Sequence, residues 1–461
     1  MNALLKIVSS SILSTLCSLV IAFVIPLKIG VNDFGYWQVF FLYSTFLGLF
    51  TFGFLDGIHL NYSGENNNNK EKLFKSYFIF LIKLLLIVFC ILIIFIYLLF
   101  KYDVKQEIFY YLAINVLLFN LNGFFIHLSQ VQRKISFYSI SLVLDKLIFV
   151  VLILPLLFWS NENNYILLIQ INLLSRIILL AIQIYFSKEI FKVKAYPLIK
   201  IRKKIITNFK RGGILTLSLL ISIALLTYPR LIVEWKFSIE TFSIFSLGLS
   251  VISMVIQIVS SVSAVLYAYI KSQKDEIYNL VINKINILLS CLSPVIFISY
   301  FIAYIIINNF LDNYSKILDY LFIYYPVIIF QVKNNLILLN SFKVFKIEKK
   351  LLFLNLVSLL MISFVFIISS LLIDFDVSYI SFIFLICNIF SNLIMIIVLN
   401  KYSESSLSYP FIDILMTFIF IISCRFLDLK FAFIIMVITS LVYYLFNYKS
   451  MNHLFRRGKY D

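Results

Sequence analysis

The hydrophobic positions of this chain form long, continuous runs separated by short polar segments. Most runs have the roughly 17–25 residues that a membrane-spanning helix needs. The fourteen runs cover residues 5–27, 37–57, 76–100, 108–128, 137–159, 165–186, 212–233, 242–270, 285–308, 319–341, 350–372, 378–399, 410–424 and 431–448. The run at 410–424 is short and contains Asp413, so the pattern predicts 12 to 14 spans. We therefore expect an all-α integral membrane protein with about 14 transmembrane helices.

Composition agrees with this pattern. Of the 461 residues, 62% are hydrophobic and 13% are charged, whereas soluble domains have about 45–50% apolar and about 25% charged residues. A water-soluble globular enzyme is therefore excluded. A disordered chain is excluded too, because disorder requires low hydrophobicity.

The net charge of +17 is explained mainly by topology. With a cytoplasmic N-terminus, the cytoplasmic segments hold 27 Lys and Arg residues and the external loops hold 7. Cytoplasmic loops of membrane proteins are enriched in Lys and Arg, and Trp prefers the membrane interface. Trp37, Trp159 and Trp235 all fall at the predicted outer ends of spans. We expect a multi-pass membrane protein with both termini in the cytoplasm, and no nucleic-acid partner.

A basic loop at residues 187–211 divides the chain. It predicts an N-terminal six-helix half at 1–208, a C-terminal six-helix half at 209–400, and an additional helix pair with a basic tail at 401–461. The segments 33–41 and 241–249 support an internal repeat, since each follows a Pro-containing span and a short external loop. Six helices per half predict parallel repeats, with two bundles around a central cavity.

Five cations lie inside predicted spans, and such residues usually face a bundle interior or a water-filled cavity. They are Lys83, Lys146, Arg176, Arg230 and Lys333. Asp145 is the one acid well inside a span, while Asp56 sits at a span end. Single cations have structural alternatives: Lys83 can snorkel, and Arg230 can pair with Glu234 at i+4. One acid cannot neutralise five cations, so the pattern predicts a cationic cavity and an anionic substrate.

Amide side chains accompany two of these cations. Asn172, Arg176 and Gln183 share one helical face, and Gln331 and Asn335 share another beside Lys333. Arg can bind a diphosphate bidentately, and amides suit sugar hydroxyls, so these four amides are candidate sugar contacts. The alternative is hydrogen bonding between helices. That role is the expected one for four other residues, Asn115, Asn122, Asn388 and Asn392.

No catalytic, metal or cofactor motif is present in the sequence. The three histidines (His59, His127 and His453) are scattered along the chain, and no phosphate-binding glycine loop occurs. We expect a protein that is not an enzyme and needs no cofactor. Asp145 is the candidate site for coupling to a proton or cation, and its alternative role is to neutralise Lys83 or Arg176.

Three segments resemble the Wzx-type oligosaccharide flippases. Residues 25–60 (IPLKIGVNDFGYWQVFF…GLFTFGFLDGIHL) are similar to that family's first two helices, residues 229–255 to its seventh and eighth, and residues 130–146 to its fourth-to-fifth connection. The resemblance implies the fold of multidrug and toxic-compound extrusion transporters. It also implies outward translocation of undecaprenyl-diphosphate-linked repeat units across the bacterial inner membrane for O-antigen or capsule synthesis, by alternating access. Arg176, Lys146 and Lys333 would then form the cationic lumen.

Two alternatives belong to other classes. A membrane enzyme of the same pathway, such as the O-antigen polymerase, usually carries a large external loop, but every external loop here is short. A cation-coupled multidrug exporter of the same fold would need a more acidic cavity. The expected partners are the lipid-linked oligosaccharide and membrane lipids, with the polysaccharide polymerase and chain-length regulator as further candidates.

Overall fold

The computed structural model describes residues 2–62, 70–99, 104–159, 164–271, 275–372, 376–402 and 411–457. Helices cover the described parts of all fourteen hydrophobic runs, two of which are interrupted by a bend, and no strand occurs within these ranges. In the described part of the chain, ten helices are long and apolar enough to cross a membrane, or up to 12 if each of two bent pairs forms one span. The predicted all-α membrane class is therefore confirmed.

The helices alternate with short connections along the whole chain. Their bounds are α1 Asn2–Lys28, α2 Val31–Ser44, η1 Leu47–Thr51, α3 Phe54–Tyr62, α4 Glu71–Leu99, α5 Lys105–Val131, α6 Ile135–Trp159, α7 Tyr165–Phe186, α8 Lys188–Phe191, α9 Leu198–Lys236, α10 Ile239–Lys271, α11 Asp275–Phe310, η2 Asp312–Ile317, α12 Leu318–Tyr324, α13 Val327–Lys333, η3 Asn334–Leu338, α14 Leu339–Val344, α15 Glu348–Leu372, α16 Val377–Leu399, α17 Phe411–Phe426 and α18 Leu429–Arg457.

Two spans are broken, each for a visible local reason. The second bends by 60° between Val31–Thr51 and Phe54–Tyr62, where Phe52 and Gly53 adopt positive φ angles of 51° and 82°. The tenth bends by 52° between Asp312–Tyr324 and Val327–Val344. Pro326, which cannot donate a backbone hydrogen bond, stands at this second break.

The described residues pack into two compact units, 1–246 and 247–461. The boundary between the units lies within α10. The predicted three-part division at residues 208 and 400 rests on the basic loop and the repeat, and it stays a prediction from sequence.

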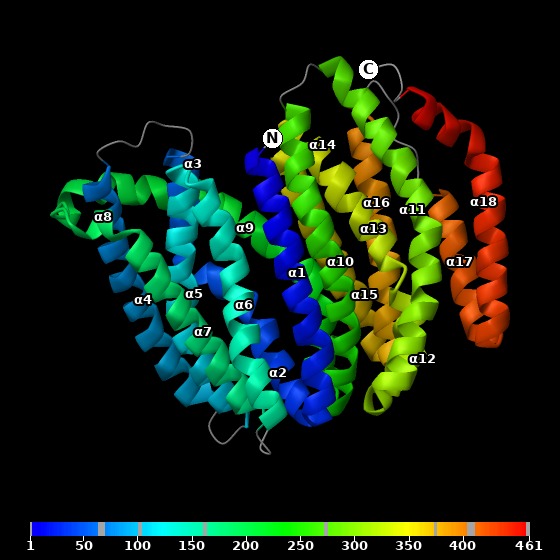
Figure 1. Cartoon of the computed structure of the whole chain (residues 1–461), viewed down its shortest axis with the longest axis horizontal. Coiled ribbons are helices and arrows are strands. Elements are labelled where there is room, and N and C mark those ends of the chain that lie inside the picture. Colours follow the sequence, from blue (N-terminus) through cyan, green and yellow to red (C-terminus); the bar gives the residue numbers. More distant parts are fainter. Residues whose placement is uncertain are drawn as a thin grey trace. The chain divides into compact units, whose positions relative to one another are not determined.

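In the first unit, α4, α5 and α7 lie side by side, and α1 packs along α6 (Figure 1). Glycines bring α3 and α9 into close backbone contact. A Cβ atom added at Gly57 would collide with the backbone of Asn208, and one at Gly212 would collide with the carbonyl oxygen of Gly53. Small residues let helix backbones approach closely, so the glycine-rich end of the second hydrophobic run is a packing surface.

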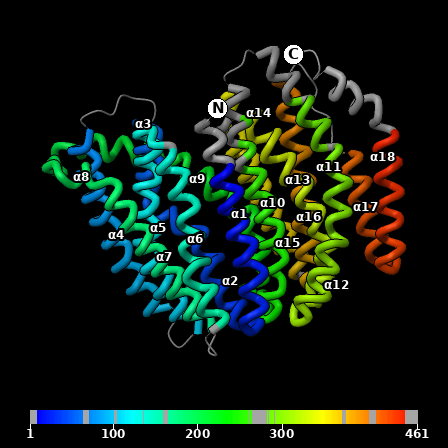
Figure 2. The backbone as a smooth tube through the Cα atoms, in the orientation of Figure 1, coloured from blue at the N-terminus to red at the C-terminus, as the bar shows by residue number. Residues whose placement is uncertain are grey.

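In the second unit, α15 packs on α16, and α11 packs on α18. The helices α17 and α18 lie side by side at the C-terminal end of the chain (Figure 2). With 16 residues, α17 is about 24 Å long, shorter than the roughly 30 Å hydrocarbon core. Crossing of the membrane by α17 and α18 therefore stays a prediction.

Candidate functional site

Arg176 lies near the middle of α7. This helix begins at Asn164, whose side-chain oxygen accepts a hydrogen bond from the backbone N–H of Leu167 at 3.0 Å. The Arg176 Nη1 donates to the Oδ1 of Asn115 on α5 at 2.8 Å, and the guanidinium lies 5.1 Å from the ring centre of Phe119. Both partners are neutral, and Arg176 makes no ion pair with a carboxylate in the described part of the chain. The cation is therefore oriented but not neutralised by its contacts.

The predicted polar face of α7 has hydrogen-bonding atoms left over. The Arg176 Nε, the Asn172 Oδ1 and both side-chain polar atoms of Gln183 are buried without a hydrogen-bond partner among the described residues. Buried polar groups are nearly always paired in folded proteins. This face can therefore offer donors and acceptors to a bound polar group.

Lys146 and Asp145 lie on α6, which packs against both α1 and α7. The Lys146 Nζ donates to the Oγ of Ser18 on α1 at 2.5 Å. Asp145 acts electrostatically on both Lys146 and Arg176. The first unit thus brings together three of the predicted residues, with two cations and one acid.

Lys83 and Arg230 lie outside this group. Lys83 is exposed on α4, on the same helical face as the exposed residues Ile87 and Ile94, which fits the snorkelling alternative. Arg230 is buried near the C-terminal end of α9, and its Nη2 donates to the carbonyl oxygen of Ser246 at 3.1 Å. Glu234, the sequence-based candidate partner of Arg230, forms an ion pair with Lys105 at 2.5 Å.

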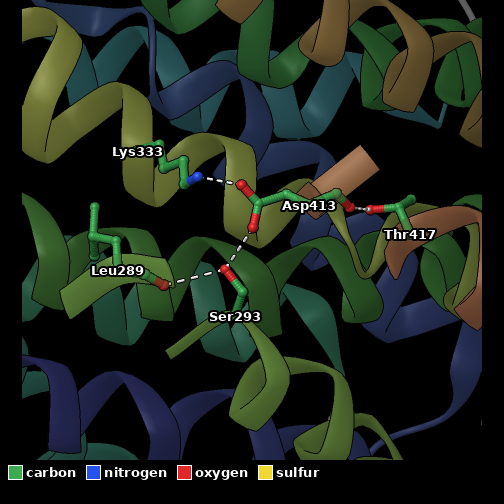
Figure 3. A network of polar contacts seen from close by, with 5 residues as sticks. All are labelled: Leu289, Ser293, Lys333, Asp413 and Thr417. Carbon is green, nitrogen blue, oxygen red and sulfur yellow. Dashed lines mark hydrogen bonds and ion pairs between the residues drawn. The ribbon is translucent and has the colours of Figure 1, made fainter. Parts of the chain in front are cut away.

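Lys333, at the end of α13, forms an ion pair with Asp413 of α17 (Figure 3). The two side chains are only 11% and 4% exposed. Counting Asp145 as the one well-buried acid was wrong, because α17 brings a second carboxylate into the bundle. The Asp413 Oδ1 also accepts a hydrogen bond from the Oγ of Ser293 on α11 at 2.9 Å. Lys333 therefore differs from Arg176 in having a full negative charge beside it.

The amides near Lys333 bond within the protein. The Gln331 Nε2 donates to the Oδ1 of Asn388 on α16 at 2.6 Å, and the Asn335 Nδ2 donates to the carbonyl oxygen of Gln331 at 2.9 Å. Asn388 joins two helices as expected. Asn392 instead donates within α16, to the Asn388 carbonyl oxygen at 2.9 Å. These contacts match the hydrogen-bonding alternative, and the sugar-contact role of Gln331 and Asn335 stays a prediction.

Two asparagines of α5, Asn115 and Asn122, both reach other helices. Besides holding Arg176, Asn115 donates from Nδ2 to the Oγ of Ser44 at 3.2 Å, and Asn122 donates to the carbonyl oxygen of Arg176 at 3.1 Å. Their predicted interhelical role is confirmed. Asn115 has a second role that spacing did not reveal, since it also orients the guanidinium.

A further polar group joins residues that looked scattered in the sequence. His59 on α3 and His127 on α5 have ring centres 5.7 Å apart, and Asp56 acts electrostatically on both rings. The Asp56 Oδ2 accepts a hydrogen bond from the Thr216 Oγ1 on α9 at 2.5 Å. The sequence offered one signal for this proximity. Both histidines fall at the predicted cytoplasmic ends of spans, which would place them at the same level in the membrane.

Comparison with solved structures identifies the fold. The lipid II flippase MurJ, in an inward closed conformation, matches with a TM-score of 0.68 and 15% identity over 97% of this chain and 98% of that chain. An inward-facing multidrug resistance MATE transporter of the MOP superfamily matches with a TM-score of 0.61 and 13% identity over 86% of this chain and 100% of that one. A MOP superfamily transporter from Pyrococcus furiosus, described as having a binding pocket of reverse polarity, matches with a TM-score of 0.57 and 13% identity over 87% of this chain and 95% of that chain.

At these identities the likeness concerns the fold alone. No protein-family model matches the sequence, and no curated protein matches it either. The chain is a multi-pass membrane protein with the MATE and MurJ-like fold, as the predicted class required.

Proposed function

We propose that this protein is a flippase that moves lipid-linked oligosaccharide diphosphates across the bacterial inner membrane by alternating access. The substrate carries its charge on a diphosphate and its bulk in sugars and an undecaprenyl chain. The product serves O-antigen or capsular polysaccharide synthesis. On this proposal the protein is not an enzyme, both termini are cytoplasmic, and the polysaccharide polymerase and chain-length regulator are its functional partners.

Arg176 carries the proposal. A guanidinium in the middle of a membrane helix is costly to maintain, and here its close contacts are an amide and an aromatic ring. Two neighbours on the same face, Asn172 and Gln183, have unpartnered polar atoms. An oriented, un-neutralised cation beside free amide groups suits a phosphate attached to a sugar.

The multidrug exporter is the second candidate, because MATE transporters share the fold. A transporter of cationic drugs needs a site with surplus negative charge. Around Arg176 the balance is the reverse, since Lys146 and Arg176 face a single described acid, Asp145. Charge therefore favours the anionic substrate over a cationic drug.

The direct test is flipping in proteoliposomes. The purified chain is reconstituted with a fluorescent undecaprenyl diphosphate-linked sugar, and a membrane-impermeant quencher reports how fast label leaves the protected leaflet. We expect Arg176→Ala to slow flipping at least about 30-fold, since truncating one partner of a buried charged contact typically costs about 2–5 kcal/mol. Arg176→Lys should retain part of the rate, because the charge survives and the bidentate geometry does not.

Lys83→Ala is the matched control, since it also removes one cation from a predicted span, but from an exposed position. It should flip at the wild-type rate. Equal reconstitution and a monodisperse elution profile exclude misfolding. Wild-type flipping by Arg176→Ala would refute the assignment, and ethidium transport without lipid flipping would establish the drug exporter instead.

A further inference from the structure

Three helices of the second unit meet at one polar network (Figure 3). The Lys333 Nζ on α13 contacts the Oδ2 of Asp413 on α17, and the Ser293 Oγ on α11 contacts the Oδ1 of the same carboxylate at 2.9 Å. The Thr417 Oγ1 donates to the Asp413 main-chain oxygen at 2.7 Å, one turn along α17. One oxygen of the Asp413 carboxylate thus contacts the Lys333 ammonium, and the other contacts the Ser293 hydroxyl.

The hydroxyl of Ser293 has two acceptors and one proton. Besides Asp413, its Oγ lies 3.1 Å from the carbonyl oxygen of Leu289, one turn back on α11. A hydroxyl donates one hydrogen bond at a time. Ser293 can therefore direct its proton to Asp413 and keep this hydrogen bond if the carboxylate loses its other partner.

The other side of the pair lies on an irregular helix. Lys333 is followed at once by a π-helical turn, Asn334–Leu338, and α13 begins at the 52° bend beside Pro326. Single π-helical turns occur frequently at functional sites. Lys333 is also the more exposed partner, at 11% against 4% for Asp413. The cation is therefore the less deeply buried member of the pair.

We propose that Asp413 is a displaceable counter-ion for Lys333. It neutralises the ammonium while the transporter is empty, and an anionic group of the substrate takes its place when the substrate binds. This inference rests on the proposed function, because it requires an anionic substrate. Ser293 then supplies the neutral partner that the displaced carboxylate keeps.

The arrangement gives the two units different roles. Among the described residues, Arg176 contacts only neutral groups closely, so it can bind an anion without first losing a partner. Lys333 is paired with Asp413, so an anion must compete with that carboxylate to bind it. A buried cation with no counter-ion is expensive. Pairing Lys333 with Asp413 lowers the free-energy cost of burying this cation in the empty protein. Binding at Lys333 then requires an anion that can displace a carboxylate.

The test uses inorganic pyrophosphate as the probe and the full chain in nanodiscs of neutral phosphatidylcholine, with affinity measured by calorimetry. Asp413→Asn should bind pyrophosphate about tenfold tighter than wild type, since the competing carboxylate is gone. Ser293→Ala should bind it several-fold more weakly, because the displaced carboxylate then has no partner. The gain in Asp413→Asn should vanish when Lys333→Met is added.

Glu189→Gln is the control for net charge. It removes one acid from the exposed ion pair with Lys134, so it should leave pyrophosphate affinity unchanged. If Asp413→Asn and Ser293→Ala both bind as wild type does, Asp413 is a purely structural partner and the inference is overturned. If neither wild type nor any variant binds pyrophosphate, this inference and the proposed diphosphate site fall together. A failure of lipid flipping alongside the expected affinity changes would refute only the proposed function.

Two competitors identify the source of the anion. Undecaprenyl diphosphate and phosphatidylglycerol both carry phosphate, and each is added to the nanodiscs holding Asp413→Asn. Competition with pyrophosphate by undecaprenyl diphosphate alone supports displacement by the substrate. Equal competition by phosphatidylglycerol overturns that assignment in favour of bulk membrane lipid.

Discussion

A single methyl group placed between α3 and α9 should destabilise the first unit, while the same group one residue along should not. In Gly212→Ala the new Cβ would collide with the carbonyl oxygen of Gly53, a backbone atom that can move only if the two helices separate. In Gly213→Ala the nearest such atom is the carbonyl oxygen of Phe52 at 3.8 Å, which is an ordinary van der Waals contact. The two variants are chemically identical and adjacent, so their difference isolates helix packing.

The magnitude follows from what the helices share. Overpacking a tight contact typically costs about 1–3 kcal/mol. Separation would also weaken two hydrogen bonds between the helices, from Thr216 to Asp56 at 2.5 Å and from Asn61 to Asn208 at 2.6 Å, each worth about 1 kcal/mol. We therefore expect Gly212→Ala to lose roughly 2–5 kcal/mol, or at least about 5 °C in the melting midpoint of a unit of this size.

The assay is a thermal melt of the purified protein in detergent, followed by the loss of the monodisperse peak in size-exclusion chromatography. Gly213→Ala should melt within about 1 °C of wild type, because it introduces no collision. Equal midpoints for the two variants would refute the reasoning that α3 and α9 are held at backbone contact by Gly212.

Three other outcomes are expected. Lys333→Ala should lower the melting midpoint by several degrees, because it leaves Asp413 buried without its cation. Adding Asp413→Asn should restore most of this loss in the same melt, and a midpoint that stays low would mean that the ion pair is not the cause of the destabilisation. Asp145→Asn should abolish the response of flipping to collapse of the proton or sodium gradient, and wild-type flipping that ignores both gradients would leave Asp145 with a structural role. In a background without native cysteines, Lys203→Cys should react with an impermeant thiol reagent only after cells are permeabilised, and labelling of intact cells would reverse the predicted orientation.

The resemblance to oligosaccharide flippases led to the same fold that the solved structures show. The resemblance rested partly on a loosely defined motif around residues 33–60. The glycines of this motif are physically constrained, because they permit the close contact of α3 with α9. The finer identity of the substrate could not be obtained in the same way. A sugar is recognised by amides and aromatic groups that also serve as packing residues, as Gln331 and Asn388 do here.

Membrane residence and helical class were determined by the sequence alone, because hydrocarbon forces each spanning segment to satisfy its own backbone hydrogen bonds. The long apolar runs therefore specified the helical class and the segments that form the spans, whereas the number of spans, predicted as 12 to 14, compares with ten to 12 candidate spans among the described residues. Spacing within one helix also placed Asn172, Arg176 and Gln183 on one face, since the helical period is local information.

Pairing between distant helices was decided only by the tertiary structure. Lys333 and Asp413 are 80 residues apart, and nothing in their local sequence links them, so a count of charges left Lys333 without a partner. His59 and His127 met in the same way, through the contact of α3 with α5. The physical reason is the same in both cases: a helix's own sequence fixes which face is polar, but the neighbour that this face meets depends on how all the helices of the unit pack together.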